Sequence, residues 1–427
     1  MKIFKFGGAS VKDASAVQNV AQILDRYRND RVVVVISAMG KTTNALEKVL
    51  ALFYEKNDWS LALREIREFH DRIVDDLFGE KNPQQLRERL AGIFEEVVRY
   101  LSKAGNFVPD EIYDKVISVG ELVSTTIVES YLDEKEYSTC WLDARRLVRT
   151  DSRFRNARVD WEITRRHVRM EVERRPDTRL FITQGFIGSD HRGRTVTLGR
   201  EGSDYTAAIM ANCLDAESVT IWKDVPGILN GDPKLVRNTL LYKELPYREA
   251  AEMTYYGASV IHPKTIRPLG EKNIPLYVRS FINYEEPGTV IHDCQVENLA
   301  PAVIFKFRQV LLTFSMPNFT FINEKHLTLI FHALDTFDIR LNVMQNSAVS
   351  ISICADYRPG KLKELLQHLG NDFQVKYNLD VNLVTIKNFT EEVLAGVIAD
   401  LNPEDELLLE QRSRNNVHLI VQPAVSV

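Results

Sequence analysis

The chain has 427 residues, with 54 lysine or arginine residues against 59 aspartate or glutamate residues and a formal net charge of −5. This balance argues against nucleic-acid binding driven by overall positive charge, and the length suffices for two or three domains. The four cysteines stand alone in the sequence, which favours a reducing compartment and argues against a zinc site or a disulfide framework. The sequence shows neither a signal-peptide pattern nor an apolar run approaching about 18 residues, so we expect a cytoplasmic protein without membrane contact.

The first 45 residues contain two units in which a strand runs into a small, polar loop. Residues 2–6 predict a strand, residues 7–10 a glycine turn, and the apolar spacing of residues 17–24 a helix. Residues 31–36, RVVVVI, are typical of a strand buried on both faces of a parallel sheet. Lys5 lies at a strand end beside Gly7 and Gly8, where an ammonium could meet phosphates, although the P-loop pattern is absent and an ordinary strand-end lysine is the alternative. Together the two units indicate a doubly wound α/β domain.

Residues 47–113 have helical spacing of charged and apolar residues, which predicts two or three helices inserted in this domain. His70 is interpreted as a residue on a helix face, because no second histidine follows at the spacing of a metal site. The stretch KVISVGELVSTTIVESYL predicts a strand followed by a helix that begins near Glu121.

The stretch from residue 184 to residue 233 contains two turn-rich loops and an acidic strand end. The turn GREGSD precedes the alanine-rich helix YTAAIMANCL, so free backbone N–H groups at the helix start favour a bound anion. Arg200, Ser203 and Asp204 add a guanidinium, a hydroxyl and a carboxylate to this turn. The strand SVTIW ends at Lys223 and Asp224, at the edge where open α/β sheets bind ligands.

One more helix and one more strand follow, with His262 at a turn or helix start, and residues 295–301 form a predicted linker. From residue 302 onward short strands and short helices alternate, as in two β-α-β-β units of the ferredoxin-like kind. We expect an α+β regulatory module here.

The ordered set KFGGAS, SAMGKTTN, VGELVST, LDARRLVRTDSRF, GFIGSD, TLGREGSDYTAA, KDVPGILNGDP, YGASVIHPKT and IPLYVRS resembles the aspartate kinases, which have an amino-acid kinase fold and C-terminal tandem ACT domains. The resemblance implies an α/β fold, a three-layer αβα sandwich with a mainly parallel sheet, followed by α+β ferredoxin-like domains. It implies a catalytic domain over residues 1–294 with a helical insertion at about 47–113, and ACT-like domains over 302–370 and 371–427.

The resemblance also implies roles for individual residues. The implied catalytic residues are Lys5, Arg200 and Asp204. The implied aspartate-binding residues are Ser37, Thr43, Glu121, Phe186, Arg200, Glu201, Gly202 and Ser203. The implied nucleotide-binding residues are Lys5, Gly7, Gly8, Ser10, Lys223, Asp224, Leu229, Lys234 and Ser259. No residue is assigned as a metal ligand.

Three positions depart from the family pattern. Ala9 stands where threonine is usual, Lys223 replaces a small polar residue, and Ser259 replaces a lysine, for which Lys223 or Lys264 would compensate.

The implied activity is the phosphorylation of the L-aspartate side chain by ATP with Mg²⁺, giving 4-phospho-L-aspartate, the first step toward lysine, threonine and methionine. A carboxylate is already anionic at neutral pH, so a site of cations and glycine amides without a catalytic His or Cys suits this reaction. The alternatives are a kinase acting on glutamate or N-acetylglutamate, and an amino-acid-binding regulator without activity.

The expected partners are L-aspartate, ATP, lysine or threonine as effector, and a second copy of the chain bound through the ACT domains. The segment MPNFTFINE lacks the glycine usual near the effector, and Ala348 stands where a glutamate often holds the effector's amino group. Weak inhibition by lysine is therefore expected.

Overall fold

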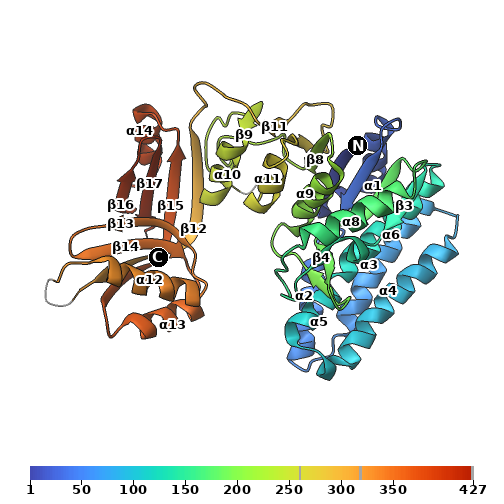
Figure 1. Cartoon of the computed structure of the whole chain (residues 1–427), viewed down its shortest axis with the longest axis horizontal. Coiled ribbons are helices and arrows are strands. Elements are labelled where there is room, and N and C mark those ends of the chain that lie inside the picture. Colours follow the sequence, from blue (N-terminus) through green and yellow to red (C-terminus); the bar gives the residue numbers. More distant parts are fainter. Residues whose placement is uncertain (259–260, 317–319, 425–427) are drawn as a thin grey trace. The chain divides into compact units, whose positions relative to one another are not determined.

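The computed structural model describes residues 1–258, 261–316 and 320–424, and the chain divides into two compact units (Figure 1). The first unit comprises Met1–Ile228, Leu241–Ala251 and Val260–Gln295. The second comprises Leu229–Leu240, Glu252–Ser259 and Val296–Val427. The division of the chain into domains at residues 294 and 370 stays a prediction.

The first unit is built on a mainly parallel sheet with the strand order β3-β5-β2-β1-β8-β10-β11-β9. Its strands are β1 (Lys2–Phe6), β2 (Val32–Ile36), β3 (Thr139–Leu142), β5 (Leu180–Gln184), β8 (Ser218–Lys223), β9 (Glu244–Pro246), β10 (Leu276–Ser280) and β11 (Thr289–His292). Among these neighbours only β10 and β11 pair in antiparallel fashion. A small second sheet contains β4 (Arg149–Thr150), β6 (Ile187–Asp190) and β7 (Thr195–Thr197).

Helices cover both faces of the main sheet. They are α1 (Ala14–Asp25), α2 (Thr42–Tyr54), α3 (Ser60–Phe78), α4 (Gln84–Ser102), α5 (Pro109–Ile117), α6 (Val119–Glu134), α7 (Ala144–Leu147), α8 (Trp161–Glu173), α9 (Gly202–Leu214), α10 (Tyr247–Tyr256) and α11 (Pro263–Gly270), with 3₁₀ turns at Gly8–Val11 and Ala104–Asn106. Phe4 and Phe6 of β1 face an apolar core shared with α1 to α6. Because side chains alternate along a strand, Lys5 points to the opposite face, where α9 lies against β1.

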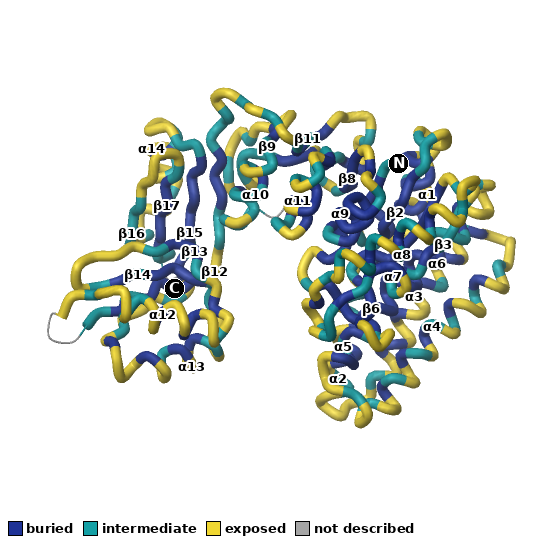
Figure 2. Tube along the Cα trace, viewed as in Figure 1, coloured by how far each residue is buried: buried dark blue, intermediate teal, exposed yellow. Residues whose placement is uncertain are grey.

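The small residues of helix α9 allow it to pack closely against the main sheet. Figure 2 shows α9 buried along most of its length, and Ala207, Ala208 and Ala211 are all fully buried. Alanine is the best helix former and lets the helix pack closely against β1, β2 and β8. The start of α9 is thereby held at the carboxyl ends of the strands.

Two sequence-based assignments in the first unit differ from the structure. The strand expected before Glu121 is helical, since α5 ends at Ile117 and α6 begins at Val119. Residues 116–119, VISV, are buried without exception, and periodicity does not separate a short buried run of this kind from a strand. The single helix expected between residues 252 and 266 is two helices, α10 and α11, and His262 caps α11 by accepting a hydrogen bond from the Lys264 backbone at 3.1 Å.

The second unit is built on an antiparallel sheet with the strand order β13-β14-β12-β15-β17-β16. Its elements are β12 (Ala302–Ser315), α12 (Glu324–Thr336), β13 (Leu341–Asn346), β14 (Ser350–Asp356), α13 (Pro359–Leu369), β15 (Gln374–Lys387), α14 (Glu391–Ala399), β16 (Glu406–Arg412) and β17 (Asn416–Gln422). Residues 374–387 form one continuous strand where the sequence predicts two, and β13 carries no clear signal in the sequence.

Two ferredoxin-like patterns share the long strands β12 and β15. Residues 309–315 of β12 pair with residues 374–381 of β15, beside β14 and β13, in the 2-3-1-4 order of that fold. Residues 302–306 pair with residues 383–387, beside β17 and β16. A parallel-dominated α/β unit followed by an α+β unit with an antiparallel sheet confirms the predicted fold class. Among the described residues, no helix combines the length and apolar character needed to cross a bilayer.

Candidate active site

A cavity of about 480 Å³ lies at the carboxyl ends of β1, β2 and β5, against the start of α9. Its walls are formed by Lys5, Ser37, Thr43, Tyr113, Glu121, Arg155, Phe186, Thr197, Gly199, Arg200, Glu201, Gly202, Ser203 and Asp204. Parallel α/β sheets bind ligands at this edge, because the strands deliver loop residues there and helix N-termini supply free N–H groups. The structure thus brings the predicted catalytic and aspartate-binding residues together in one cavity, while their individual roles stay predictions.

Two lysines converge on the carboxylate of Asp204, in the first turn of α9. Lys5 Nζ lies 2.7 Å from Asp204 Oδ1, and Lys223 Nζ lies 3.5 Å from Oδ2. The Asp204 side chain has no exposed surface. Burial raises the pKa of Asp204, but the two ammonium groups outweigh burial and hold that pKa below its ordinary value. The cavity therefore contains an ionised carboxylate with two cations, an arrangement suited to charge-dense ligands.

Glycines bring the backbone of neighbouring loops into close contact around this cluster. A Cβ atom at Gly185 would lie 2.5 Å from the Ser203 side chain, and one at Gly8 would lie 2.7 Å from the carbonyl oxygen of Ala38. Both positions would clash with any larger residue. The loops after β1, β2 and β5 can approach one another and α9 for this reason.

Glu121 is a buried carboxyl group on the wall of the cavity. Its Oε1 accepts a hydrogen bond of 3.4 Å from the Ala38 backbone, whereas its Oε2 is buried without a hydrogen-bond partner in the structure. Burial raises the pKa of Glu121 to about 8, although Ala38 and Lys5 act in the opposite direction. An unpaired buried oxygen at a cavity wall is a position where a ligand's donor group would bind favourably.

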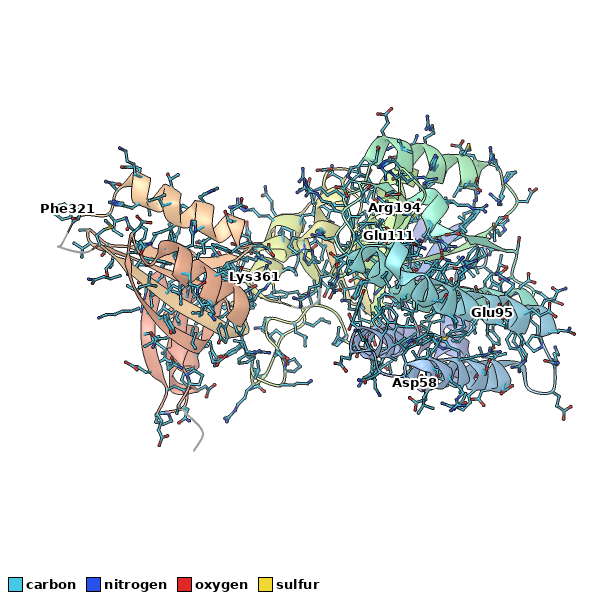
Figure 3. All side chains as sticks on the ribbon, turned by 90° about the horizontal axis from the view of Figure 1, so that it is seen from below. Asp58, Glu95, Glu111, Arg194, Phe321 and Lys361 are labelled. Carbon is cyan, nitrogen blue, oxygen red and sulfur yellow. The ribbon has the colours of Figure 1, made fainter. Side chains whose placement is uncertain are left out.

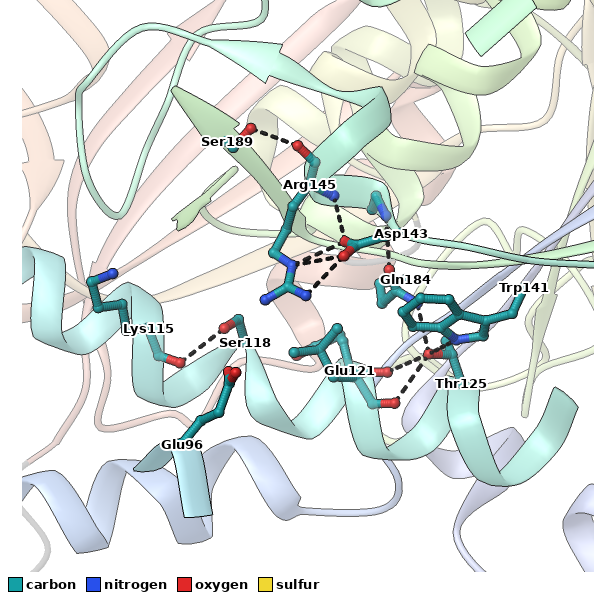
Figure 4. A network of polar contacts seen from close by, with 12 residues as sticks. Glu96, Lys115, Ser118, Glu121, Thr125, Trp141, Asp143, Arg145, Gln184 and Ser189 are labelled. Atoms are coloured by element: carbon teal, nitrogen blue, oxygen red, sulfur yellow. Dashed lines mark hydrogen bonds and ion pairs between the residues drawn. The ribbon is translucent and has the colours of Figure 1, made fainter. Parts of the chain in front are cut away.

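A polar network supports Glu121 from behind (Figure 4). The Thr125 hydroxyl donates to the Glu121 carbonyl oxygen at 2.9 Å and accepts from Gln184 Nε2 at 2.8 Å and Trp141 Nε1 at 3.1 Å. Gln184 in turn accepts from the Ala144 backbone at 2.8 Å. This network ties α6 to the end of β5, just before the Gly185 turn.

Comparisons with known proteins agree with this geometry. The model of the amino acid kinase family matches residues 1–280. Lysine-sensitive aspartokinase 3 of Escherichia coli (strain K12) is 35% identical over 356 residues, which cover 83% of this chain and 78% of that protein. The chain belongs to the amino acid kinase family, in its aspartokinase branch.

Solved aspartokinase structures are similar to nearly the whole chain. A crystal structure of E. coli aspartokinase III in complex with aspartate and ADP has a TM-score of 0.84 at 30% identity, covering 99% of this chain and 96% of that chain. A structure of E. coli aspartokinase III in complex with lysine and aspartate has a TM-score of 0.78 at 31% identity, with the same coverage. The similarity to aspartokinases thus extends through both units of the chain.

Four residues that line the cavity of this aspartokinase family member have no role in the sequence-based assignment, namely Tyr113, Arg155, Thr197 and Gly199. Arg155 directly follows the motif LDARRLVRTDSRF, which was noted without any of its residues being assigned to the site. Tyr113 and Thr197 carry no local signal, because their position in the cavity depends on the packing of α5 against β7.

Several predicted nucleotide-binding residues lie outside the cavity wall. Gly7, Gly8 and Ser10 belong to the turn after β1, Lys223 reaches the site through Asp204, and Asp224 is exposed at the end of β8. Leu229 and Lys234 belong to the second compact unit. Ser259 lies outside the described residues. A nucleotide-binding role for this set stays a prediction.

Proposed function

We propose that the chain transfers the γ-phosphoryl group of ATP to the side-chain carboxylate of L-aspartate. The observation that carries this proposal is the buried Lys5–Asp204 pair at the start of α9, in a cavity whose wall also holds the unpaired Glu121 oxygen and the exposed Arg200. The E. coli relatives named above are aspartokinases, and one was solved with aspartate and ADP. Nothing in the cavity favours the glutamate, N-acetylglutamate or non-catalytic alternatives.

The reaction needs positioning and charge neutralisation. A β-carboxylate oxygen of aspartate attacks the γ-phosphorus, the bond to the ADP oxygen breaks, and no proton has to be removed from the nucleophile. Lys5 is placed to stabilise the negative charge on the transferring group, and Asp204 holds the ammonium of Lys5 in position. Lys223 also pairs with the Asp204 carboxylate. The lysine at position 223, where the family usually has a small polar residue, therefore adds a cation to the cluster.

The amino acid would be held on the other walls. Arg200 can bind a carboxylate through two parallel hydrogen bonds. The α-ammonium group would lower the pKa of Glu121 by its positive charge, so that Glu121 releases its proton on binding and its unpaired oxygen accepts a hydrogen bond from that group. Ser37, Thr43 and Ser203 add hydroxyl groups, and Phe186, Glu201 and Gly202 complete the wall.

Mg²⁺ is proposed as the ion that accompanies ATP. The cavity wall has the carboxylates of Asp204, Glu121 and Glu201, and Asp204 is already paired with lysines. This donor set suits an ion that would be bound mainly by phosphate oxygens and water, and Asp204 is the carboxylate that would help to hold it beside the lysines. When bound, Mg²⁺ would neutralise charge on the phosphates.

The second unit is proposed to be a regulatory module that binds an amino acid and pairs with a second copy of the chain. An E. coli relative is named as lysine-sensitive, and one E. coli structure contains lysine, so lysine is the first effector to test and threonine the second. The two ferredoxin-like patterns around β12 and β15 support this proposal. A cytoplasmic location stays a prediction.

The proposal is tested with purified protein, ATP, Mg²⁺ and hydroxylamine, because hydroxylamine traps an acyl phosphate as a hydroxamate. Aspartate, glutamate and N-acetylglutamate are compared in parallel at equal concentration. Hydroxamate formed with aspartate alone supports the proposal. A preference for either other acceptor, or no product with any of the three, contradicts it.

A further inference from the structure

Asp114 of α5 is a fully buried carboxylate outside the cavity wall, and it binds two separate segments that form the wall. Its oxygens accept from the backbone N–H of Arg155 at 3.2 and 2.9 Å. They also accept from the backbone N–H of Thr197 at 2.9 Å and from its hydroxyl at 2.7 Å. A carboxylate has about four acceptor positions, so these contacts satisfy it almost completely.

Both partners of Asp114 line the cavity, and the turn that starts α9 lies next to them. A Cβ atom at Gly199 would lie 2.8 Å from Asn156 Oδ1 and 3.2 Å from the carbonyl oxygen of Arg155. The Gly199 turn therefore packs directly on the loop whose position Asp114 fixes. Arg200 follows in the same turn.

Arg155 has a backbone conformation that needs such a support. Its φ angle is 65°, in the left-handed region that non-glycine residues rarely adopt. Its guanidinium lies 3.9 Å from the centre of the Tyr113 ring and 3.3 Å from Asp110 Oδ1. Arg155 lines the cavity wall together with Tyr113, on whose ring its guanidinium lies, and it is a second arginine of the wall beside Arg200.

We propose that Asp114 is a positioning residue for the amino-acid side of the cavity. It fixes the backbone of Arg155 and Thr197. The Arg155 guanidinium is thereby kept where it attracts the dicarboxylate substrate. The inference rests on the proposed aspartate kinase activity. Asp114 itself touches no reacting atom. Its loss should therefore weaken aspartate binding and leave ATP binding nearly unchanged.

The hairpin of β6 and β7 and the loop that contains Arg155 are also held by contacts other than those of Asp114, so a variant at Asp114 is expected to fold. Arg194 of the hairpin lies 3.5 Å from Glu111 Oε2 and 2.7 Å from Asp190 Oδ2, and Figure 3 labels Glu111 and Arg194. The Arg194 guanidinium also lies 4.9 Å from the centre of the Phe154 ring in the loop. These contacts do not involve Asp114.

The test compares Asp114→Asn with Asp177→Asn in the hydroxamate assay. Asparagine has the shape of aspartate, but its amide presents N–H donors to partners that are themselves donors. We expect Asp114→Asn to raise KM for aspartate about tenfold, with KM for ATP and kcat changing less than about threefold. Asp177 is exposed in the turn between α8 and β5, so Asp177→Asn is the matched control and should change KM for aspartate less than about twofold.

A second variant shows whether Asp114 acts through Arg155. Arg155 is exposed, so the Arg155→Ala variant should fold. It should itself raise KM for aspartate about tenfold. If Asp114 acts through Arg155, the double variant should have nearly the KM of either single variant. Three results would each overturn the inference. The first is a KM for aspartate in the double variant that equals the product of the two single effects. The others are an unchanged KM for aspartate in Arg155→Ala and an equal rise of KM for aspartate and for ATP in Asp114→Asn.

The wild-type protein separates this inference from the proposed function. Absence of aspartyl hydroxamate from the wild type would contradict the function itself. If the wild type is active and Asp114→Asn has the same KM values as the wild type, only the role of Asp114 is contradicted.

Discussion

The ammonium of Lys5 lies 2.7 Å from the carboxylate of Asp204, and both side chains are buried. The position of Lys5 at a strand end predicts a side chain outside any core, whereas the structure buries it. The cause is the partner on α9, because a buried charge is tolerated when an opposite charge and hydrogen bonds compensate it. Activity and stability are therefore coupled at this pair.

Lys5→Ala is expected to lower kcat about 100-fold or more, because it removes the cation placed to stabilise the charge on the transferring phosphoryl group. It should also lower the free energy of unfolding by roughly 3 kcal/mol, since Asp204 then keeps only Lys223 as its counter-charge. Steady-state kinetics and urea denaturation measure the two effects. The double variant Lys5→Met with Asp204→Asn is the control, and it should regain much of the stability while staying inactive. Wild-type kcat in Lys5→Ala would refute the phosphate role of Lys5.

Arg200→Lys is expected to raise KM for aspartate about tenfold and KM for ATP less than about twofold, because an ammonium cannot form two parallel hydrogen bonds with a carboxylate. Initial rates with each substrate varied in turn provide the measurement. Arg192→Lys, an exposed arginine in the turn between β6 and β7, is the matched control and should change neither value. Equal effects of Arg200→Lys on both substrates would assign Arg200 to the nucleotide.

Glu121→Gln is expected to stabilise the empty protein more at pH 7 than at pH 5. The folded-state pKa of Glu121 is raised to about 8 from 4.5, so the folded protein keeps a proton that the unfolded chain has released. Stability therefore falls as pH rises through this window, and the linked loss between pH 5 and pH 7 is about 2 to 3 kcal/mol. Glutamine has no such loss. Urea denaturation at both pH values, with Glu95→Gln on exposed surface as control, checks this. A stability difference between variant and wild type that is independent of pH would contradict the raised pKa.

Lysine is expected to inhibit weakly, with half-inhibition above the low micromolar range. Ala348 is exposed in the loop between β13 and β14, and its carbonyl oxygen accepts from the Ile322 backbone at 2.9 Å, so no side-chain carboxylate is offered at this position. Part of the segment MPNFTFINE lies outside the described residues. A missing carboxylate partner for a cationic ligand costs roughly 1 to 3 kcal/mol. Lysine and threonine are titrated in the hydroxamate assay with wild type and Ala348→Glu. The variant should bind lysine about tenfold more tightly, and low micromolar inhibition of the wild type would refute the interpretation.

Features that depend on neighbours along the chain could be predicted from the residues alone. The strand before Gly7, the glycine turn before α9 and the apolar strand β2 follow from residue spacing, and the ordered motifs identified the family. Local rules suffice there because strand alternation, glycine conformations and helix starts involve residues a few positions apart.

Only the tertiary structure decided which distant groups meet. The burial of Lys5 depends on Asp204, and the bonds of Asp114 reach Arg155 and Thr197 on two other segments. The helical character of residues 116–119, VISV, was equally hidden, since a short run that is buried throughout has no polar face to distinguish a helix from a strand. In each case the deciding energy is the burial or pairing of a side chain by a segment far away in the sequence, and no local pattern records that partner.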